Sequence, residues 1–246
     1  MRVMIFLLLT ALLAANPAFA LTIATEDSPP STIVKGDALS GVSVEIIREI
    51  QKRIGDTTHI DVFPWARAYS MATTTPDFIL FATTRTPERE SLFRWIGPIF
   101  SIKWGFFAMR NKAKPLLSLE EAKADVIIGT YKDDAREQFL KSQGFTNLDS
   151  SSSQMLNIRK LKAGRIDLLV STNIGVATTP ESAGLKPGDM VNVFTFKEVE
   201  LYIAFSKGSD EATVAAWQKA FDEMRGDDTL EAIQKRWLPQ EASTGK

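Results

Sequence analysis

The stretch DVIIGTYKDDAREQFLKSQG, residues 125–144, contains a strand pattern followed directly by a helix pattern. DVIIGT (125–130) is a short apolar run, which is typical of a buried strand. DDAREQFLKSQG (133–144) predicts a helix that begins at acidic residues and ends at Gly144. A strand that leads into a helix is the unit of an α/β fold, in which helices cover both faces of a mostly parallel sheet.

The same alternation continues along the chain in two series, which predict two α/β lobes with a cleft between them. SLEE (118–121) is a capping-box pattern that opens a short helix. We expect strands near 107–113 and 196–205 to join the lobes. The other predicted strands are LTIATE (21–26), HIDVF (59–63), DFILFA (77–82), WGFFAM (104–109), RIDLLVS (165–171), VNVFTF (191–196) and VELYIAFS (199–206). The other predicted helices are SVEIIREIQKRIG (43–55), PWARAYSMAT (64–73), SSSQMLNIRKLKAG (151–164), AWQKAFDEMRG (216–226) and DDTLEAIQKRWLP (227–239).

Residues 1–20 predict a cleavable secretory signal peptide. They contain Arg2, an apolar run from Val3 to Ala15, and Ala18-Phe19-Ala20 before the expected cleavage site. The run is too short for a spanning helix, which needs about 20 apolar residues. No later stretch is long and apolar enough to span a bilayer. We therefore expect a soluble periplasmic protein after cleavage.

Composition excludes several kinds of function. The chain has no cysteine, so disulfides and thiolate metal sites are excluded, and its one histidine, His59, argues against a histidine-based metal or acid–base site. Acidic and basic residues are nearly balanced, with a formal net charge of −1. That balance argues against nucleic acid or an anionic membrane surface as the partner. We expect no metal and no cofactor.

TTRTPERESLFRWIGP, residues 83–98, places Arg85, Arg89 and Arg94 directly after the predicted strand DFILFA. In open α/β sheets, ligands bind at the carboxyl ends of the strands. DVIIGT and RIDLLVS also end in polar loops, so strand ends from both series point to one cleft. The arginine stretch therefore predicts contact with an anionic group, although Arg85 and Arg94 are equally well explained as solvated surface charges.

The ordered motifs of the chain resemble the bacterial extracellular solute-binding proteins of family 3, the polar amino-acid-binding components of ABC importers. This resemblance implies a type II periplasmic-binding-protein fold, with two lobes joined by two hinge strands and a ligand cleft between them. The first lobe would comprise residues 21–108 with 203–246, and the second, inserted lobe residues 109–202. The motifs are Pro29-Pro30, GVSVEII (41–47), TPERESLF (86–93), IIGTYKDDAREQFL (127–140), KAGRIDLLVST (162–172) and FDEMRGDDTLEAIQKRWLP (221–239).

The resemblance also implies roles for individual residues. In the family, the arginine of the TPER motif grips the ligand's α-carboxylate, and Arg89 occupies that position. Thr84 would donate its hydroxyl to the same carboxylate. Trp65 would stack on the ligand side chain, with core packing as the alternative. Arg67 either points towards this cleft or lies on the surface, and Tyr131 is expected to form a second aromatic wall.

Two positions depart from the family pattern. Thr172 stands where the family has an aspartate for the ligand's α-ammonium, and threonine supplies no charge there. Asp133 and Asp134 stand where the family has glycine and a hydroxyl residue. The two aspartates either cap the helix or meet a cationic group of the ligand. An uncompensated ammonium in a closed cleft costs several kcal/mol. Either the ligand lacks an ordinary α-amino group, or another acidic residue replaces the family aspartate as the partner of the ammonium. Asp134 is our first choice, with Asp133 and Glu26 as alternatives.

These features predict a binding protein and not an enzyme. We expect a monomeric periplasmic receptor that captures a small polar, amino-acid-like carboxylate by closure of its lobes and delivers it to an inner-membrane ABC permease. One alternative is a periplasmic sensor subunit that reports the ligand to a membrane receptor. Another is a small-molecule lyase or hydrolase on the same fold, for which Glu26, Asp133 and Asp134 are the candidate acids or bases.

Overall fold

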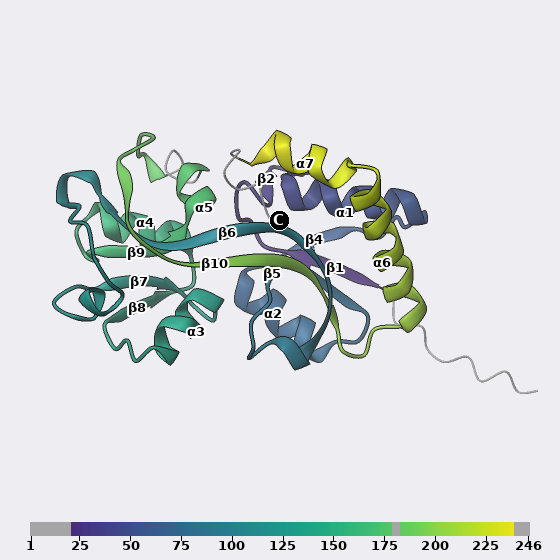
Figure 1. Cartoon of the computed structure of the whole chain (residues 1–246), viewed down its shortest axis with the longest axis horizontal. Coiled ribbons are helices and arrows are strands. Elements are labelled where there is room, and N and C mark those ends of the chain that lie inside the picture. The colour runs from purple at the N-terminus through teal and green to yellow at the C-terminus, as the bar shows by residue number, and fades with distance from the viewer. Residues whose placement is uncertain (1–20, 179–182, 239–246) are drawn as a thin grey trace, which may run out of the picture.

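A computed structural model describes residues 21–178 and 183–238 of the 246-residue chain. The predicted signal peptide at 1–20 lies outside the described residues. Within the described ranges, no helix is both long enough and apolar enough to cross a bilayer. Figure 1 shows two halves side by side, with two long strands that run through both.

Each half is built of a sheet covered by helices on both faces (Figure 1). The first half contains β1 (Thr22–Thr25), β4 (Ile60–Val62), β5 (Phe78–Thr84), α1 (Val42–Ile54), α2 (Trp65–Thr74), α6 (Glu211–Gly226), α7 (Thr229–Trp237), the 3-10 turn Glu90–Leu92, and a hairpin of β2 (Ile33–Lys35) and β3 (Ala38–Ser40). The second half contains β7 (Ile128–Tyr131), β8 (Leu148–Ser151), β9 (Leu168–Thr172), α3 (Ala135–Ser142), α4 (Gln154–Lys162), α5 (Asn173–Thr178) and the 3-10 turns Arg110–Lys112 and Glu120–Lys123.

One eight-stranded sheet runs through both halves in the order β4-β1-β5-β10-β6-β9-β7-β8. Strands β6 (Phe93–Met109) and β10 (Met190–Ser206) pair antiparallel along their whole lengths and connect the halves. Parallel pairs occur at the two outer parts of the sheet, where β1 lies between β4 and β5 and β7 lies between β8 and β9. The mixed α/β class predicted from the sequence is confirmed.

The connecting strands differ from the prediction in length. WGFFAM is only the last part of β6, which begins at Phe93 and continues through Gly97 and Pro98. The predicted strands 191–196 and 199–206 are parts of the single strand β10. β6 and β10 pair with each other along their whole lengths. This pairing keeps both strands extended where the local strand pattern of the sequence is interrupted. SLEE leads into a 3-10 turn, Glu120–Lys123, and not an α-helix.

Helix α1 shows how the sequence pattern produces the core. Ile46, Ile47 and Ile50 are fully buried on one side of the helix, as their helical spacing predicts. Gly55 ends the helix with a φ of 72°, a left-handed conformation that glycine adopts without strain. Burial of this face against the sheet fixes the first half, and thereby the strand ends that face the second half.

The carboxyl ends of strands from both halves meet between them. β1 leads into Glu26, β7 ends at Tyr131, β9 ends at Thr172, and β5 ends at Thr84. This convergence follows from the parallel orientation of strands within each half. The structure therefore brings these four loop regions, far apart in the sequence, to one place.

The close pairing of β6 with β10 yields a stability prediction at Gly105. A Cβ atom there would lie 2.5 Å from Asn192 Nδ2 and 2.7 Å from the Phe194 carbonyl oxygen. We expect Gly105→Ala to lower the free energy of unfolding by about 1–3 kcal/mol through overpacking. Each kcal/mol should lower the unfolding midpoint by about 2–4 °C, measured by circular dichroism. Gly226→Ala is the control, because a Cβ there meets nothing within 4 Å; a similar loss in both variants would contradict the prediction.

Candidate functional site

A cavity of about 470 Å³ lies between the two halves. This volume is in the usual range of small-molecule sites, about 300–1,000 Å³. The cavity is lined by the strand ends of both halves and by β6 and β10. Its aromatic lining consists of Phe63, Trp65, Phe81, Trp104 and Tyr131, and its hydroxyl lining of Thr25, Ser28, Ser31, Thr84, Ser152, Ser153, Ser171 and Thr172.

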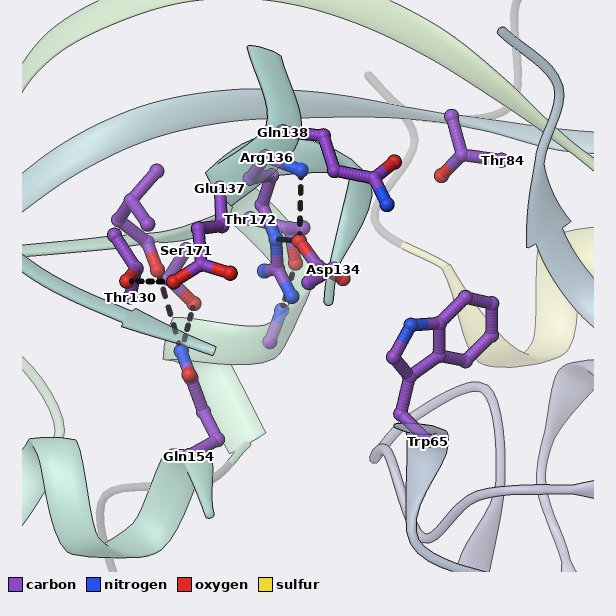
Figure 2. A network of polar contacts seen from close by, with 12 residues as sticks. Trp65, Thr84, Thr130, Asp134, Arg136, Glu137, Gln138, Gln154, Ser171 and Thr172 are labelled. Carbon is purple, nitrogen blue, oxygen red and sulfur yellow. Dashed lines mark hydrogen bonds and ion pairs between the residues drawn. The ribbon is translucent and has the colours of Figure 1, made fainter. Parts of the chain in front are cut away.

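A charged cluster forms one part of the cavity wall. Asp134 is the N-cap of α3, and its Oδ1 accepts hydrogen bonds from the Arg136 backbone N at 2.9 Å and from Arg136 Nε at 2.6 Å. The Tyr131 hydroxyl accepts a hydrogen bond from Trp65 N, in the first half, at 3.3 Å, and Glu26, also in the first half, lies near enough to Tyr131 for each group to affect the other's pKa. In Figure 2, Asp134 and Arg136 lie together across from Trp65. The cluster thus combines two carboxylates and one guanidinium.

Burial and neighbouring charges change the proton affinities of this cluster. Burial, reinforced by the negative charge of Asp134, raises the pKa of Glu26 to about 8. Burial acts in the same direction on Asp134, but the charge and hydrogen bonds of Arg136 outweigh it and hold the pKa of Asp134 below its ordinary value. Glu26 is therefore mostly protonated at neutral pH, whereas Asp134 is ionised and paired.

The second half contributes helix N-termini with hydroxyl caps. Ser153 Oγ caps α4 by accepting from Leu156 N at 3.4 Å. Gln154 Nε2 donates to the Val170 carbonyl and to Ser171 Oγ, both at 3.3 Å, as Figure 2 shows. Backbone N–H groups at such helix starts favour polar or anionic ligand groups.

Thr172 has a structural task at the start of α5. Its Oγ1 accepts a hydrogen bond from Gly175 N at 2.9 Å, at the start of α5. The side chain also lines the cavity. The position expected to meet an ammonium thus also caps a helix, a task that threonine and aspartate can both perform.

Six residues of the predicted site line the cavity, and two do not. The six are Glu26, Trp65, Thr84, Tyr131, Asp134 and Thr172. Arg67 is exposed, and its guanidinium lies 4.6 Å from the Phe63 ring, outside the cavity wall. Arg89 is also absent from the wall. The roles predicted for all eight remain predictions, and for Arg67 and Arg89 the cavity lends them no support.

Arg89 is 1% exposed and lies against the second half of the molecule. Its guanidinium carbon is 5.2 Å from the Trp65 ring centre and 4.6 Å from the Tyr69 ring centre. Its Nη2 donates to the Asp133 carbonyl at 3.3 Å and to Gln138 Oε1 at 3.2 Å. Its environment is therefore a contact between the halves.

Sequence reasoning missed Arg136 and Trp104, which both line the cavity. Arg136 lies only two residues after Asp134, in the first turn of α3, which follows a strand end already placed at the cleft. Asking which other charged side chains lie in that helix turn would have found it. Trp104 stands inside an apolar strand, where nothing local separates a cavity wall from ordinary core.

The raised pKa of Glu26 predicts how stability depends on pH. Between its ordinary pKa of 4.5 and its folded-state value of about 8, the folded chain holds a proton that the unfolded chain releases. The free energy of unfolding should therefore fall as the pH rises through this interval, by about 1.4 kcal/mol for each pH unit. Glu26→Gln removes the titrating group and should flatten this fall. Urea denaturation between about pH 5 and 9 measures it.

Glu223→Gln is the matched control, because Glu223 is an exposed residue of α6 outside the cavity. It should reproduce the wild-type dependence on pH. If Glu26→Gln loses stability with rising pH as steeply as the wild type does, then Glu26 has an ordinary pKa in the folded protein and the prediction is wrong. The other groups that act on Glu26 are Asp134, Arg136, Tyr131 and Asp27, and all remain in the variant.

Comparison with known proteins agrees with this architecture. The chain is 21% identical over 219 residues to the arginine-binding extracellular protein ArtP of Bacillus subtilis (strain 168), covering 87% of this chain and 84% of that protein. A histidine kinase sensor domain with similarity to periplasmic binding proteins superposes with a TM-score of 0.79 at 20% identity, covering 88% of this chain and 96% of that one. An ancestral arginine-binding protein bound to arginine gives a TM-score of 0.77 at 20% identity, covering 89% and 98%.

The structural likeness establishes a type II periplasmic-binding-protein fold. A family profile matches residues 21–240, nearly all of the chain that follows the predicted signal peptide. The chain belongs to the bacterial extracellular solute-binding proteins, family 3.

Proposed function

We propose that this protein is a periplasmic receptor that captures a small polar, amino-acid-like carboxylate between two lobes and delivers it to an inner-membrane ABC permease. The observation that carries the proposal is the cavity, because both halves contribute its walls and its charged cluster. Membership of a family of extracellular binding proteins supports it. Named relatives include an arginine-binding protein, and we take amino acids as the first ligands to test.

The lining suits a ligand with a flat or apolar part and several polar groups. Trp65 and Tyr131 offer aromatic surfaces, on which an apolar chain, a planar group or a cation can lie. The hydroxyl groups and Gln154 offer donors and acceptors. Glu26 offers a carboxylate that loses its proton readily once a cation lies beside it, because a neighbouring positive charge lowers a carboxyl pKa.

The proposed mechanism is capture followed by closure. We assign residues 21–108 with 203–246 to one lobe and 109–202 to the other, with the bend in β6 and β10. A hinge in two strands allows rigid-body closure of the lobes. The ligand must bind the closed form more tightly than the open form, since only a difference in affinity shifts the population. The monomer expected from the sequence suffices for this mechanism.

A sensor subunit is the second candidate. It is favoured by the structural likeness to a histidine kinase sensor domain, with a TM-score of 0.79. The same closure serves both roles, so the ligand site does not separate them. Permease and ATPase genes beside the gene of this protein would favour delivery, whereas a receptor-kinase gene there would favour sensing.

Thermal unfolding against a panel of ligands tests the proposed function. The panel contains L-arginine, L-histidine, L-glutamine and L-glutamate, the amines agmatine and histamine, and simple organic acids. A ligand present at one hundred times its dissociation constant adds about 2.7 kcal/mol of stability. We expect one amino acid to raise the midpoint by about 5–10 °C. Absence of any shift, in protein first unfolded and refolded to remove carried-over ligand, would contradict the proposal.

A further inference from the structure

We propose that two arginines divide the work of the cleft: Arg89 latches the two lobes together, and Arg136 is the cation that meets the ligand's carboxylate. The role of Arg89 stands on interlobe contacts alone. The role of Arg136 rests on the proposed function, because it concerns a ligand in the cavity. The division differs from the role that the TPER motif implies for Arg89.

The latch is centred on one backbone carbonyl, that of Asp133 in the second lobe. Trp65 Nε1 donates to it at 3.0 Å and Arg89 Nη2 at 3.3 Å, both from the first lobe. Arg89 Nη2 also donates to Gln138 Oε1 at 3.2 Å. These bonds exist only while the lobes are together, so they favour the closed state.

The loop of the second lobe is built to present this carbonyl. Asp133 has a φ of 59°, in the left-handed region, which turns the chain sharply after β7. Glu137 holds the loop from within, because its carboxylate accepts from Asp133 N at 3.0 Å and from Thr130 Oγ1 at 2.9 Å. Glu137 is only 1% exposed, and Figure 2 shows its bond to Thr130. A preorganised acceptor loses little freedom when the lobes meet.

Arg89 is covered where a ligand would have to reach it. The rings of Trp65 and Tyr69 pack against the guanidinium, and the second lobe covers Nη2. Within the described residues Arg89 Nε has no acceptor, and Nη1 donates to the Thr84 carbonyl of its own lobe at 3.5 Å. The cation is therefore held by ring faces, two carbonyls and an amide oxygen, and not by a carboxylate of the described residues.

Arg136 has the access that Arg89 lacks. It is the one arginine or lysine among the described residues that line the cavity. Its contact with Asp134 is made through Nε, at 2.6 Å. A guanidinium paired through Nε still has its two terminal nitrogens to offer a ligand carboxylate, and Asp134 fixes its orientation.

The latch is tested first, without ligand. Because the sequence contains no cysteine, Ser70→Cys and Gln143→Cys give one unique label pair. Both positions are exposed, at α2 and the end of α3, which lie on the same side of the sheet in the two halves (Figure 1). Double electron–electron resonance then reports the lobe separation. We expect Arg89→Gln to shift the ligand-free distribution to longer distances, and Gln138→Ala to shift it less. An unchanged distribution in both variants overturns the latch.

Arg85→Gln is the matched control for the latch. Arg85 lies in the same loop, and its guanidinium bonds to Glu90 within the first lobe, at 2.7 and 2.5 Å. It should leave the lobe separation unchanged. A single unfolding transition by circular dichroism shows that each variant is folded. Gln138→Ala keeps the test decisive if Arg89→Gln fails to fold, since Gln138 is only partly buried.

Ligand pairs that differ by one carboxylate test the division of roles. L-arginine and agmatine form the first pair, and L-histidine and histamine the second, measured by calorimetry. Arg136→Gln should reduce the preference for the amino acid over its amine by roughly tenfold or more. The double variant Asp134→Asn with Arg136→Gln should reduce this preference as well. Because it leaves the summed charge of the ion pair at zero, it separates loss of the guanidinium from a change in the net charge of the cavity. Arg89→Gln should weaken both members of a pair by the same factor, roughly tenfold, because it changes only closure.

The outcomes separate the two parts. Loss of the carboxylate preference in Arg89→Gln, with the preference kept in Arg136→Gln, overturns the division of roles. If neither pair binds and no other amino acid of the panel shifts the unfolding midpoint, the Arg136 assignment is overturned together with the amino-acid ligand proposed above. The distance measurement then still decides the latch, because it needs no ligand.

Discussion

The antiparallel pairing of β6 with β10 is the constraint on which the rest of the molecule depends. The pairing runs from Met109 opposite Met190 to Phe93 opposite Ser206, and so passes through both halves. It places the two halves on one sheet, and their relative movement requires these two strands to bend. The strand ends of both halves consequently face the same gap. The cavity, the charged cluster and the interlobe contacts all follow from that placement.

Charge in the cavity is arranged asymmetrically. Arg136 neutralises Asp134, which leaves Glu26 as a less exposed carboxylate without an ion pair, whereas Asp27 lines the cavity as an exposed residue. Burial then keeps Glu26 protonated near neutral pH. Under the proposed function, a ligand that brings its own positive charge can replace the proton on Glu26. The missing family aspartate at Thr172 therefore does not make the cavity unsuitable for an ammonium.

The sequence predicted what depends on local pattern. The strand at DVIIGT, the buried face of α1, its end at Gly55 and the gathering of strand ends are all found in the structure. It did not predict the length of β6, because long-range pairing with β10 keeps that strand extended through Gly97 and Pro98. Nor did it separate Arg89 from Arg136. Both follow strand ends, and only the positions of Trp65 and the second lobe decide which one the cavity reaches.

That last difference has a physical cause that applies to any receptor with two lobes. A donor at a strand end meets whatever fills the space opposite, which is either ligand or the other lobe. Here the left-handed turn at Asp133 brings a carbonyl to Arg89, and Glu137 holds it there. A ligand would have to displace this acceptor before it could bind Arg89. Because Arg136 already lies on the cavity wall, a carboxylate that binds there leaves the interlobe contacts intact, and binding and closure then reinforce each other.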